Sequence, residues 1–204
     1  MIGFYNYTVI LTYVGMLSSF TGIILSFNGK IYGAVMALLF SGLCDMFDGK
    51  IASTKKDRTK EEKMFGIQID SLSDLICFGV LPAVIVYAMN KNDVTVALFC
   101  GFYVLCALIR LSFFNVDEAN RQEETDEKRT LYLGMPVTSS AVIFPLFYYV
   151  CTKLGTVSNI VSACLMCLIG LLFISPLKLK KPGMIGKVIL STVGIIELVL
   201  IILK

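Results

Sequence analysis

Long uncharged stretches alternate along this chain with short charged ones. Residues 7–28, 131–152 and 154–177 contain no Asp, Glu, Lys or Arg, and each is long enough for a helix that crosses a hydrocarbon core, which takes about 20 residues. The whole pattern marks seven apolar segments: 6–28, 31–52, 65–90, 94–115, 136–153, 156–175 and 184–203. It predicts an all-α polytopic transmembrane helical bundle with about seven spans, six and eight being the alternatives.

Polar connections between these segments show how the spans follow one another. The joins at 28–30 and 90–93 are short, as expected between antiparallel neighbouring helices. The connections 53–63 and 116–133 are longer and rich in charge. No repeat or low-complexity tract interrupts the pattern, so we expect one integral membrane domain over residues 1–204. The amino terminus lacks the basic region and cleavage site of a signal peptide, so the first span is expected to stay in the protein.

The composition agrees with a membrane protein and narrows its chemistry. Hydrophobic residues make up 56% of the chain and charged ones 16%, whereas a soluble domain carries about 25% charged residues. A secreted disulfide scaffold, a nucleic-acid binder and a disordered chain are therefore disfavoured. No histidine is present, which excludes histidine bases and imidazole zinc sites. Acid–base or metal chemistry must then use carboxylates, which suit Mg²⁺, Mn²⁺ or Ca²⁺.

Basic residues crowd one side of the predicted bundle. If Met1 is cytosolic, the connections 53–63, 116–133 and 178–187 face the cytosol with their flanking helix ends. The other side keeps only four of the 18 Lys and Arg residues, namely Lys30, Lys91, Lys153 and Lys204. The positive-inside rule favours this orientation. It predicts an integral protein of the cell membrane with its longer loops in the cytosol.

Acidic residues stand inside two of the predicted spans, near their cytosolic ends. Asp45 and Asp48 are three residues apart and share one helix face. Asp70 and Asp74 are four apart on the next span and share a face in the same way. An ionised carboxylate at membrane depth is costly unless it faces a cavity, a partner or a metal. Because the two spans form an antiparallel hairpin, we expect all four acids to converge at one interface.

Small residues lie on the same faces as the four acids. Gly49 and Ala52 continue the first face, and Gly66 begins the second. Four carboxylates in one place repel one another, and two divalent cations would relieve that repulsion. Two metals form a clamp suited to a phosphate or pyrophosphate, and side chains this small let a bulky ligand lie against the backbone.

These residues reproduce the pattern of a known family. The sequence reads Asp45-x-x-Asp48-Gly49-x-x-Ala52-Ser53 and then Gly66-x-x-x-Asp70-x-x-x-Asp74. It resembles the CDP-alcohol phosphatidyltransferases, whose signature is D-x-x-D-G-x-x-A-R followed by G-x-x-x-D-x-x-x-D. The segments 65–83, 107–116 and 132–136 further resemble the phosphatidylserine synthase branch of that family. Because the likeness runs over residues 41–136, we take this region as the catalytic core.

Two features depart from the family pattern. Ser53 stands where the family has arginine, and the 12 residues between Ser53 and Gly66 are more than the family usually has. The inserted stretch is rich in basic residues: Lys55, Lys56, Arg58, Lys60 and Lys63. One of them could make the phosphate contact of the missing arginine, and the sequence leaves open which one.

The resemblance implies a metal-dependent phosphotransferase. Such an enzyme transfers the phosphatidyl group of a CDP-lipid, either CDP-diacylglycerol or its archaeal ether analogue, to an alcohol and releases CMP. The branch implies L-serine as the alcohol, and phosphatidylserine or archaetidylserine as the product.

The same resemblance implies roles for the motif residues. The divalent-metal ligands would be Asp45, Asp48, Asp70 and Asp74. They would hold two ions of Mg²⁺ or Mn²⁺, and Ca²⁺ could occupy the site. Asp74 would also be the catalytic general base toward serine. The CDP-lipid would bind at Gly49, Ala52, Ser53 and Gly66.

Two residues beyond the motif are candidates for serine binding. Arg110 ends an otherwise uncharged span and offers a bidentate fork to a carboxylate. Asn115 lies five residues further on and would assist it. The alternative for Arg110 is an interface anchor whose charged end reaches the membrane surface.

Other functions stay open at this point. Within the family, the acceptor could be glycerol 3-phosphate or inositol phosphate, which calls for a further cationic pocket. From a different class, the acids could serve a divalent-cation transporter, but the outer halves 31–39 and 80–89 are apolar and offer no polar route. Family members are commonly dimers, so the expected partners are membrane lipids, the two substrates and a second copy of the chain, and no nucleic acid.

Overall fold

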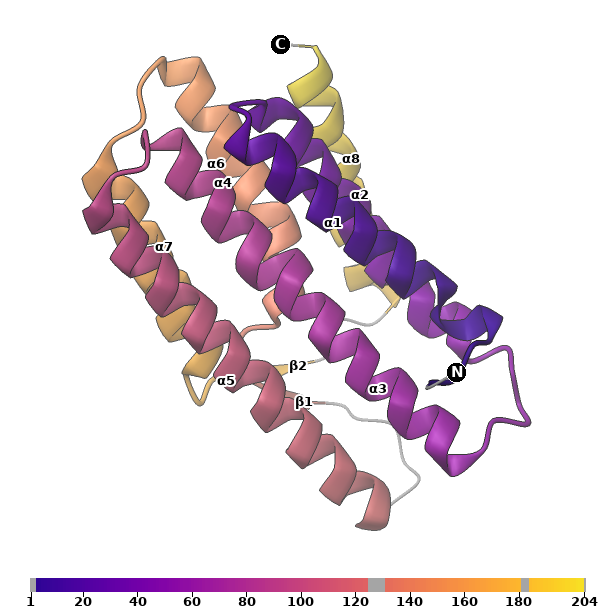
Figure 1. Cartoon of the computed structure of the whole chain (residues 1–204). Coiled ribbons are helices and arrows are strands. Elements are labelled where there is room, and N and C mark those ends of the chain that lie inside the picture. The colour runs from indigo at the N-terminus through magenta and orange to yellow at the C-terminus, as the bar shows by residue number, and fades with distance from the viewer. Residues whose placement is uncertain (1–2, 125–130, 181–183, 204) are drawn as a thin grey trace.

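Long helices running side by side form the protein, which we describe from a computed structural model covering residues 3–124, 131–180 and 184–203 (Figure 1). In chain order the elements are a 3₁₀ turn η1 (Tyr7–Val9), α1 (Ile10–Phe27), α2 (Ile31–Ala52), α3 (Lys60–Asp74), a π-helical turn η2 (Leu75–Val80), α4 (Leu81–Met89), α5 (Val94–Glu124), β1 (Leu131–Leu133), a 3₁₀ turn η3 (Val137–Ser139), α6 (Ser140–Leu154), α7 (Asn159–Ile174), β2 (Lys178–Lys180) and α8 (Met184–Ile202). Each of the seven predicted spans coincides with a helical segment, which confirms the all-α fold class.

Within the residues that the structure describes, five helical segments are long and apolar enough to cross a membrane by themselves. They are Tyr7–Phe27, Ile31–Ala52, Lys60–Met89, Val94–Arg121 and Val137–Leu154. The helix Asn159–Ile174 is apolar but shorter, and Thr192–Ile202, the part of α8 whose side chains the structure describes, is apolar as well. The number of helical segments is therefore the predicted seven. α7, with 16 residues, is shorter than the about 20 residues that a straight crossing takes, whereas α8 has 19.

Small and hydroxylated residues let α1 pack closely along α2. The buried positions of α1 include Gly15, Ser19 and Gly22, and a Cβ on Gly15 would lie 3.1 Å from the Cβ of Cys44. The hydroxyls of Ser19 and Ser41 are 2.8 Å apart and hydrogen-bond across the two helices. Such close contacts of small residues are the usual basis of helix association in membranes.

The third span is one continuous rod made of α3, η2 and α4. It begins at Lys60 and not at residue 65 as predicted, because Thr59 and Glu62 form a capping box there. The π-helical turn η2 follows directly after Asp74. Its Phe78 carbonyl accepts a 2.5 Å hydrogen bond from the hydroxyl of Tyr103 on α5, so the turn is tied to its neighbour.

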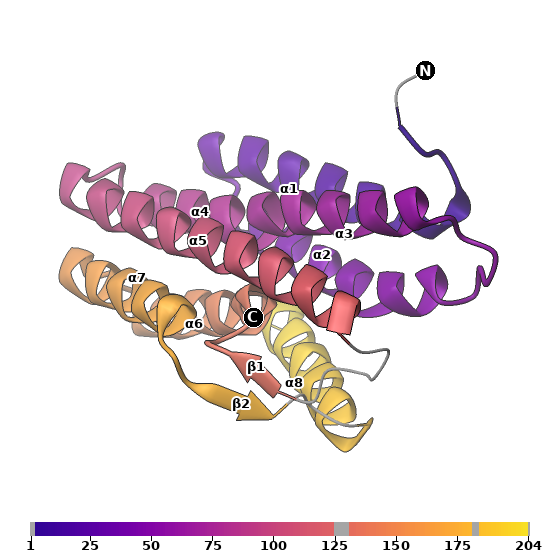
Figure 2. The ribbon, with the colours of Figure 1, turned by 90° about the horizontal axis from the view of Figure 1, so that it is seen from below.

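Two parts of the predicted 116–133 connection turn out to have regular structure. α5 continues to Glu124, and within this extension Arg121 pairs with Glu118 at 2.6 Å. β1 pairs antiparallel with β2, with Tyr132 opposite Leu179 (Figure 2). Neither feature was predicted. This short ribbon is the one departure from helical structure in the part of the chain that the structure describes.

The two ends of the bundle differ in what they carry. The amino-terminal segment, the connection between α2 and α3, the end of α5 and the β1–β2 ribbon gather at one end, and the carboxyl terminus lies at the other (Figure 1). The motif acids lie in the carboxyl-terminal parts of α2 and α3, next to the connection between these two helices or within the turns that follow it, and so in the half of the bundle that belongs to the first end. The basic connections and the acids therefore share one end of the molecule.

Candidate active site

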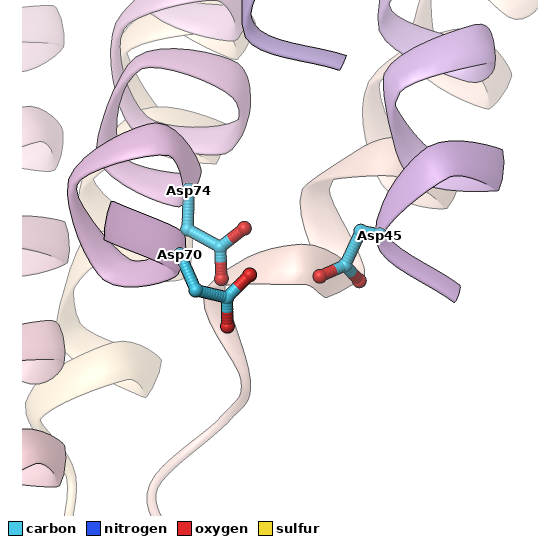
Figure 3. Close-up of side chains that lie close together, drawn as sticks. All are labelled: Asp45, Asp70 and Asp74. Atoms are coloured by element: carbon cyan, nitrogen blue, oxygen red, sulfur yellow. The ribbon is translucent and has the colours of Figure 1, made fainter. Parts of the chain in front are cut away.

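Three of the four motif acids form a compact cluster between α2 and α3. One carboxylate oxygen of Asp45, one of Asp70 and one of Asp74 all lie within 4.8 Å of one another. Figure 3 shows Asp70 and Asp74 pointing from one helix toward Asp45 on the other. Since hard divalent cations prefer several carboxylate oxygens at such spacing, this donor set fits a metal ion.

Asp48 joins this cluster from the next turn of α2. Its side chain is buried, and its Oδ2 accepts a 3.2 Å hydrogen bond from the hydroxyl of Thr12 on α1. Its carboxyl group also contacts that of Asp70. All four predicted acids are therefore brought together, three in one group and the fourth against Asp70.

Thr12 is a site residue that the sequence reasoning missed. Besides donating to Asp48, its backbone carbonyl accepts from the hydroxyl of Ser73 on α3 at 3.4 Å. It thus connects the two helices that carry the acids. The available signal was its place on the small-residue face of α1, one turn before Gly15.

A pocket of about 310 Å³ lies beside the acids. Its lining residues are Thr8, Val9, Thr12, Asp48, Gly49, Ala52, Arg58, Lys63, Gly66, Ile67 and Asp70. The three small residues that the motif singles out, Gly49, Ala52 and Gly66, are all among them. A Cβ on Gly49 would meet nothing within 4 Å, so the space above its backbone is open.

Basic side chains from the connection before α3 and from the first turn of α3 also reach this pocket. Arg58 and Lys63 line it, whereas Ser53 is exposed and donates to the carbonyl of Lys50 at 2.7 Å. Lys55 pairs instead with Glu62 at 2.8 Å, and this hydrogen bond raises the pKa of the Lys55 ammonium. The sequence left open which of five basic residues makes the phosphate contact. Two of the five, Arg58 and Lys63, line the pocket in the structure.

The two predicted serine-binding residues lie apart from that pocket. Arg110 is 6% exposed, stacks 5.4 Å above the ring of Phe114 and lines a separate pocket of about 180 Å³ together with Phe173. Asn115 accepts a 2.7 Å hydrogen bond from Ser71 and donates to Gln68 at 3.3 Å, both on α3. It therefore fastens α5 to the helix that carries Asp70 and Asp74.

Comparison with known proteins places this site in a family. The profile of the CDP-alcohol phosphatidyltransferases matches residues 5–193. Because this match takes in nearly the whole chain, the chain belongs to the CDP-alcohol phosphatidyltransferase family. The predicted family and phosphotransferase class are thereby confirmed. Enzymes of this family depend in general on divalent cations, in agreement with the acid cluster.

Three relatives show where in the family the chain stands. It is 31% identical over 170 residues to an archaetidylserine synthase of Methanothermobacter thermautotrophicus, covering 83% of this chain and 67% of that protein. It is 30% identical over 157 residues to a CDP-diacylglycerol–serine O-phosphatidyltransferase of Saccharomyces cerevisiae, covering 71% and 55%. A protein of that name from Methanocaldococcus jannaschii is 29% identical over 170 residues, covering 83% and 72%. The chain thus spans between 55% and 72% of the length of these relatives.

Proposed function

We propose that this chain transfers the phosphatidyl group of a CDP-lipid to the hydroxyl of L-serine, releasing CMP and forming phosphatidylserine or archaetidylserine. The observation that carries the proposal is the convergence of Asp45, Asp70 and Asp74 beside a pocket floored by small residues. The choice of serine is supported by the three relatives, each of which is named for a serine product or acceptor.

The acids and the small residues would divide the binding of the donor between them. Asp45, Asp48, Asp70 and Asp74 would hold two divalent cations, Mg²⁺ or Mn²⁺, which when bound neutralise charge on the pyrophosphate. Gly49, Ala52 and Gly66 would let the cytidine nucleotide lie against the backbone. Ser53 would stand at the rim of this floor.

Asp74 would act as the catalytic base. It would accept the proton of the serine hydroxyl while the serine oxygen bonds to the phosphorus that carries the lipid. The bond from that phosphorus to the oxygen bridging to CMP breaks, and CMP leaves with the electron pair. Asp74 is suited to this role because it lies one turn of α3 beyond Asp70, within the acid cluster.

The serine carboxylate would be bound by Arg110. Its guanidinium is nearly buried on α5, the helix that packs beside α3, and it can offer two parallel N–H donors. Asn115 would assist from the same helix by holding α3 in place. On the positive-inside rule we propose that this end of the bundle faces the cytosol, and we propose a homodimer as the working unit.

The test is CMP release by the purified protein in detergent, measured with and without Mg²⁺ or Mn²⁺. We expect release with serine and either diacyl or ether CDP-lipid, and none once the metal is chelated. Asp74→Asn should abolish release while the protein keeps its elution volume and helical spectrum. Faster release with glycerol 3-phosphate or inositol phosphate than with serine would contradict the acceptor. Metal flux into liposomes without CMP release would show that the chain is a divalent-cation transporter and would contradict the proposed enzyme.

A further inference from the structure

The pocket beside the acids is lined by both negative and positive side chains. Asp48 and Asp70 contribute carboxylates, and Arg58 and Lys63 contribute cations from the stretch before and at the start of α3. The acids suit metal ions, and the cations suit a phosphate that the metals do not fully neutralise. A diphosphate that bridges the two halves would satisfy both.

Of the two cations, Arg58 is the better candidate for binding a phosphate. Its Nε is buried and has no hydrogen-bond partner, and its Nη1 lies 3.7 Å from where a Cβ on Gly66 would stand. The guanidinium is therefore laid over the glycine at the start of the second motif. Buried N–H donors are nearly always paired in folded proteins, so an unpaired one on a pocket wall indicates a missing ligand. Lys63 is exposed, which leaves its ammonium more solvated.

The segment that carries Arg58 is held in place from both sides. Thr59, the next residue, forms the capping box with Glu62, and Glu62 also pairs with Lys55. The amino-terminal segment adds two contacts, from Asn6 Nδ2 to Glu62 at 3.2 Å and between the hydroxyls of Tyr7 and Thr54 at 3.1 Å. A guanidinium fixed before the ligand arrives loses less conformational freedom on binding.

We propose that Arg58 binds the diphosphate of the CDP-lipid. It would replace the arginine that follows the alanine in the family signature, a position that Ser53 occupies in this chain. The inference rests on the proposed function for the identity of the donor. It gives the longer connection before α3 a function, because Arg58 lies on this connection and lines the pocket from outside the motif. Its planar fork matches two phosphate oxygens at once, which an ammonium cannot do.

The experiment compares Arg58→Gln, Arg58→Lys and a matched control, Lys56→Gln. Lys56 is exposed on the same connection and lies outside the pocket lining. Calorimetric titration with CDP-glycerol, a soluble CDP-alcohol without acyl chains, measures diphosphate binding without turnover. We expect Arg58→Gln to weaken this binding and raise the KM for CDP-lipid by roughly tenfold or more, as loss of a charged bidentate contact does. Arg58→Lys should fall between, and the KM for serine should not change.

Several outcomes would overturn the proposal. They are unchanged CDP-glycerol binding in Arg58→Gln, an equal loss in Lys56→Gln, or a rise in the acceptor KM alone. If Arg58→Gln fails to fold, Arg58→Lys tests the bidentate contact of the guanidinium instead, because it keeps the charge; unchanged CDP-glycerol binding in Arg58→Lys would then overturn the proposal. A wild-type protein that binds CDP-glycerol through Arg58 but releases no CMP with serine would refute the proposed function and leave this inference standing.

Discussion

Single glycines decide how closely the backbone segments around the site can approach. Gly134 has φ +74°, and a Cβ there would clash with the carbonyl oxygen of Phe173 and lie 3.0 Å from that of Ser175. Its own N–H donates to the carbonyl of Leu177 at 2.8 Å. The residue after β1 is thus pressed against the end of α7, next to the pocket that Arg110 lines. No other residue type combines this φ with this contact.

We therefore predict that Gly134→Ala destabilises the protein strongly. The left-handed conformation alone costs about 1–2 kcal/mol for alanine, and the clash with two backbone carbonyls adds to it. Gly155→Ala is the matched control, since Gly155 has φ +70° and nothing within 4 Å of its Cβ position. Thermal unfolding in detergent should show a clearly larger loss for Gly134→Ala. Equal losses at both positions would mean that the contact with α7 does not form.

At the residue scale, the sequence predicted the side chains that stand in a pattern, missed Thr12, and named Arg58 only as one of five basic candidates. The four acids and the small residues between them stand at helical spacing, so their convergence could be inferred from one chain. Thr12 and Arg58 reach the same site from a different helix and from a connection. Their spacing to the motif carries no information, because only the packing of α1 and the capping of α3 places them there.

Among the elements, the π-helical turn η2 matters most for the site. It begins at the residue after Asp74 and is tied sideways by Tyr103, which is fully buried. The Tyr103 hydroxyl contacts both the Phe78 carbonyl, at 2.5 Å, and the hydroxyl of Ser140, at 2.7 Å. A single side chain thus connects η2, α5 and the start of α6. Such turns frequently occur at functional sites.

Removal of that hydroxyl should loosen this junction. We predict that Tyr103→Phe lowers the free energy of unfolding by about 1–3 kcal/mol. The substitution removes the hydrogen-bond partner of two buried groups, the Ser140 hydroxyl and the Phe78 carbonyl. Tyr32→Phe serves as control, since Tyr32 is exposed. Thermal unfolding in detergent again measures the difference. If both variants unfold at the wild-type temperature, Tyr103 does not hold η2 in place.

The positions of the helices were predictable from hydropathy, but their ends and irregularities were not. Apolar runs gave all seven segments, because the bilayer imposes their length. The start of α3 at Lys60 depends on the capping box of Thr59, and α5 continues to Glu124 through a charged stretch that reads as a loop. The β1–β2 ribbon pairs segments more than 40 residues apart, and neither three-residue stretch has a sequence pattern that predicts this pairing.

For the whole molecule, the sidedness of the two ends determines which compartment the site faces. The acids, Arg58 and the basic connections share one end of the bundle, opposite the carboxyl terminus (Figure 1). The proposed acceptor serine and the proposed product CMP are small and charged, so under the proposed function the pocket opens to the compartment that supplies serine and takes up CMP. From the distribution of Lys and Arg we predict that this compartment is the cytosol.

Labelling of introduced cysteines tests this assignment directly. Lys56→Cys lies on the connection between α2 and α3, and Lys30→Cys lies at the opposite end, between α1 and α2; both positions are exposed. With a membrane-impermeant maleimide on intact cells, we expect Lys30→Cys to be labelled and Lys56→Cys to be labelled only after permeabilisation. The native cysteines set the background, because they lie within the helices and five of the seven are buried. The reverse pattern would put the pocket outside and remove the basis for a cytosolic reaction. Labelling of both sites on intact cells would instead mean that the chain adopts both orientations.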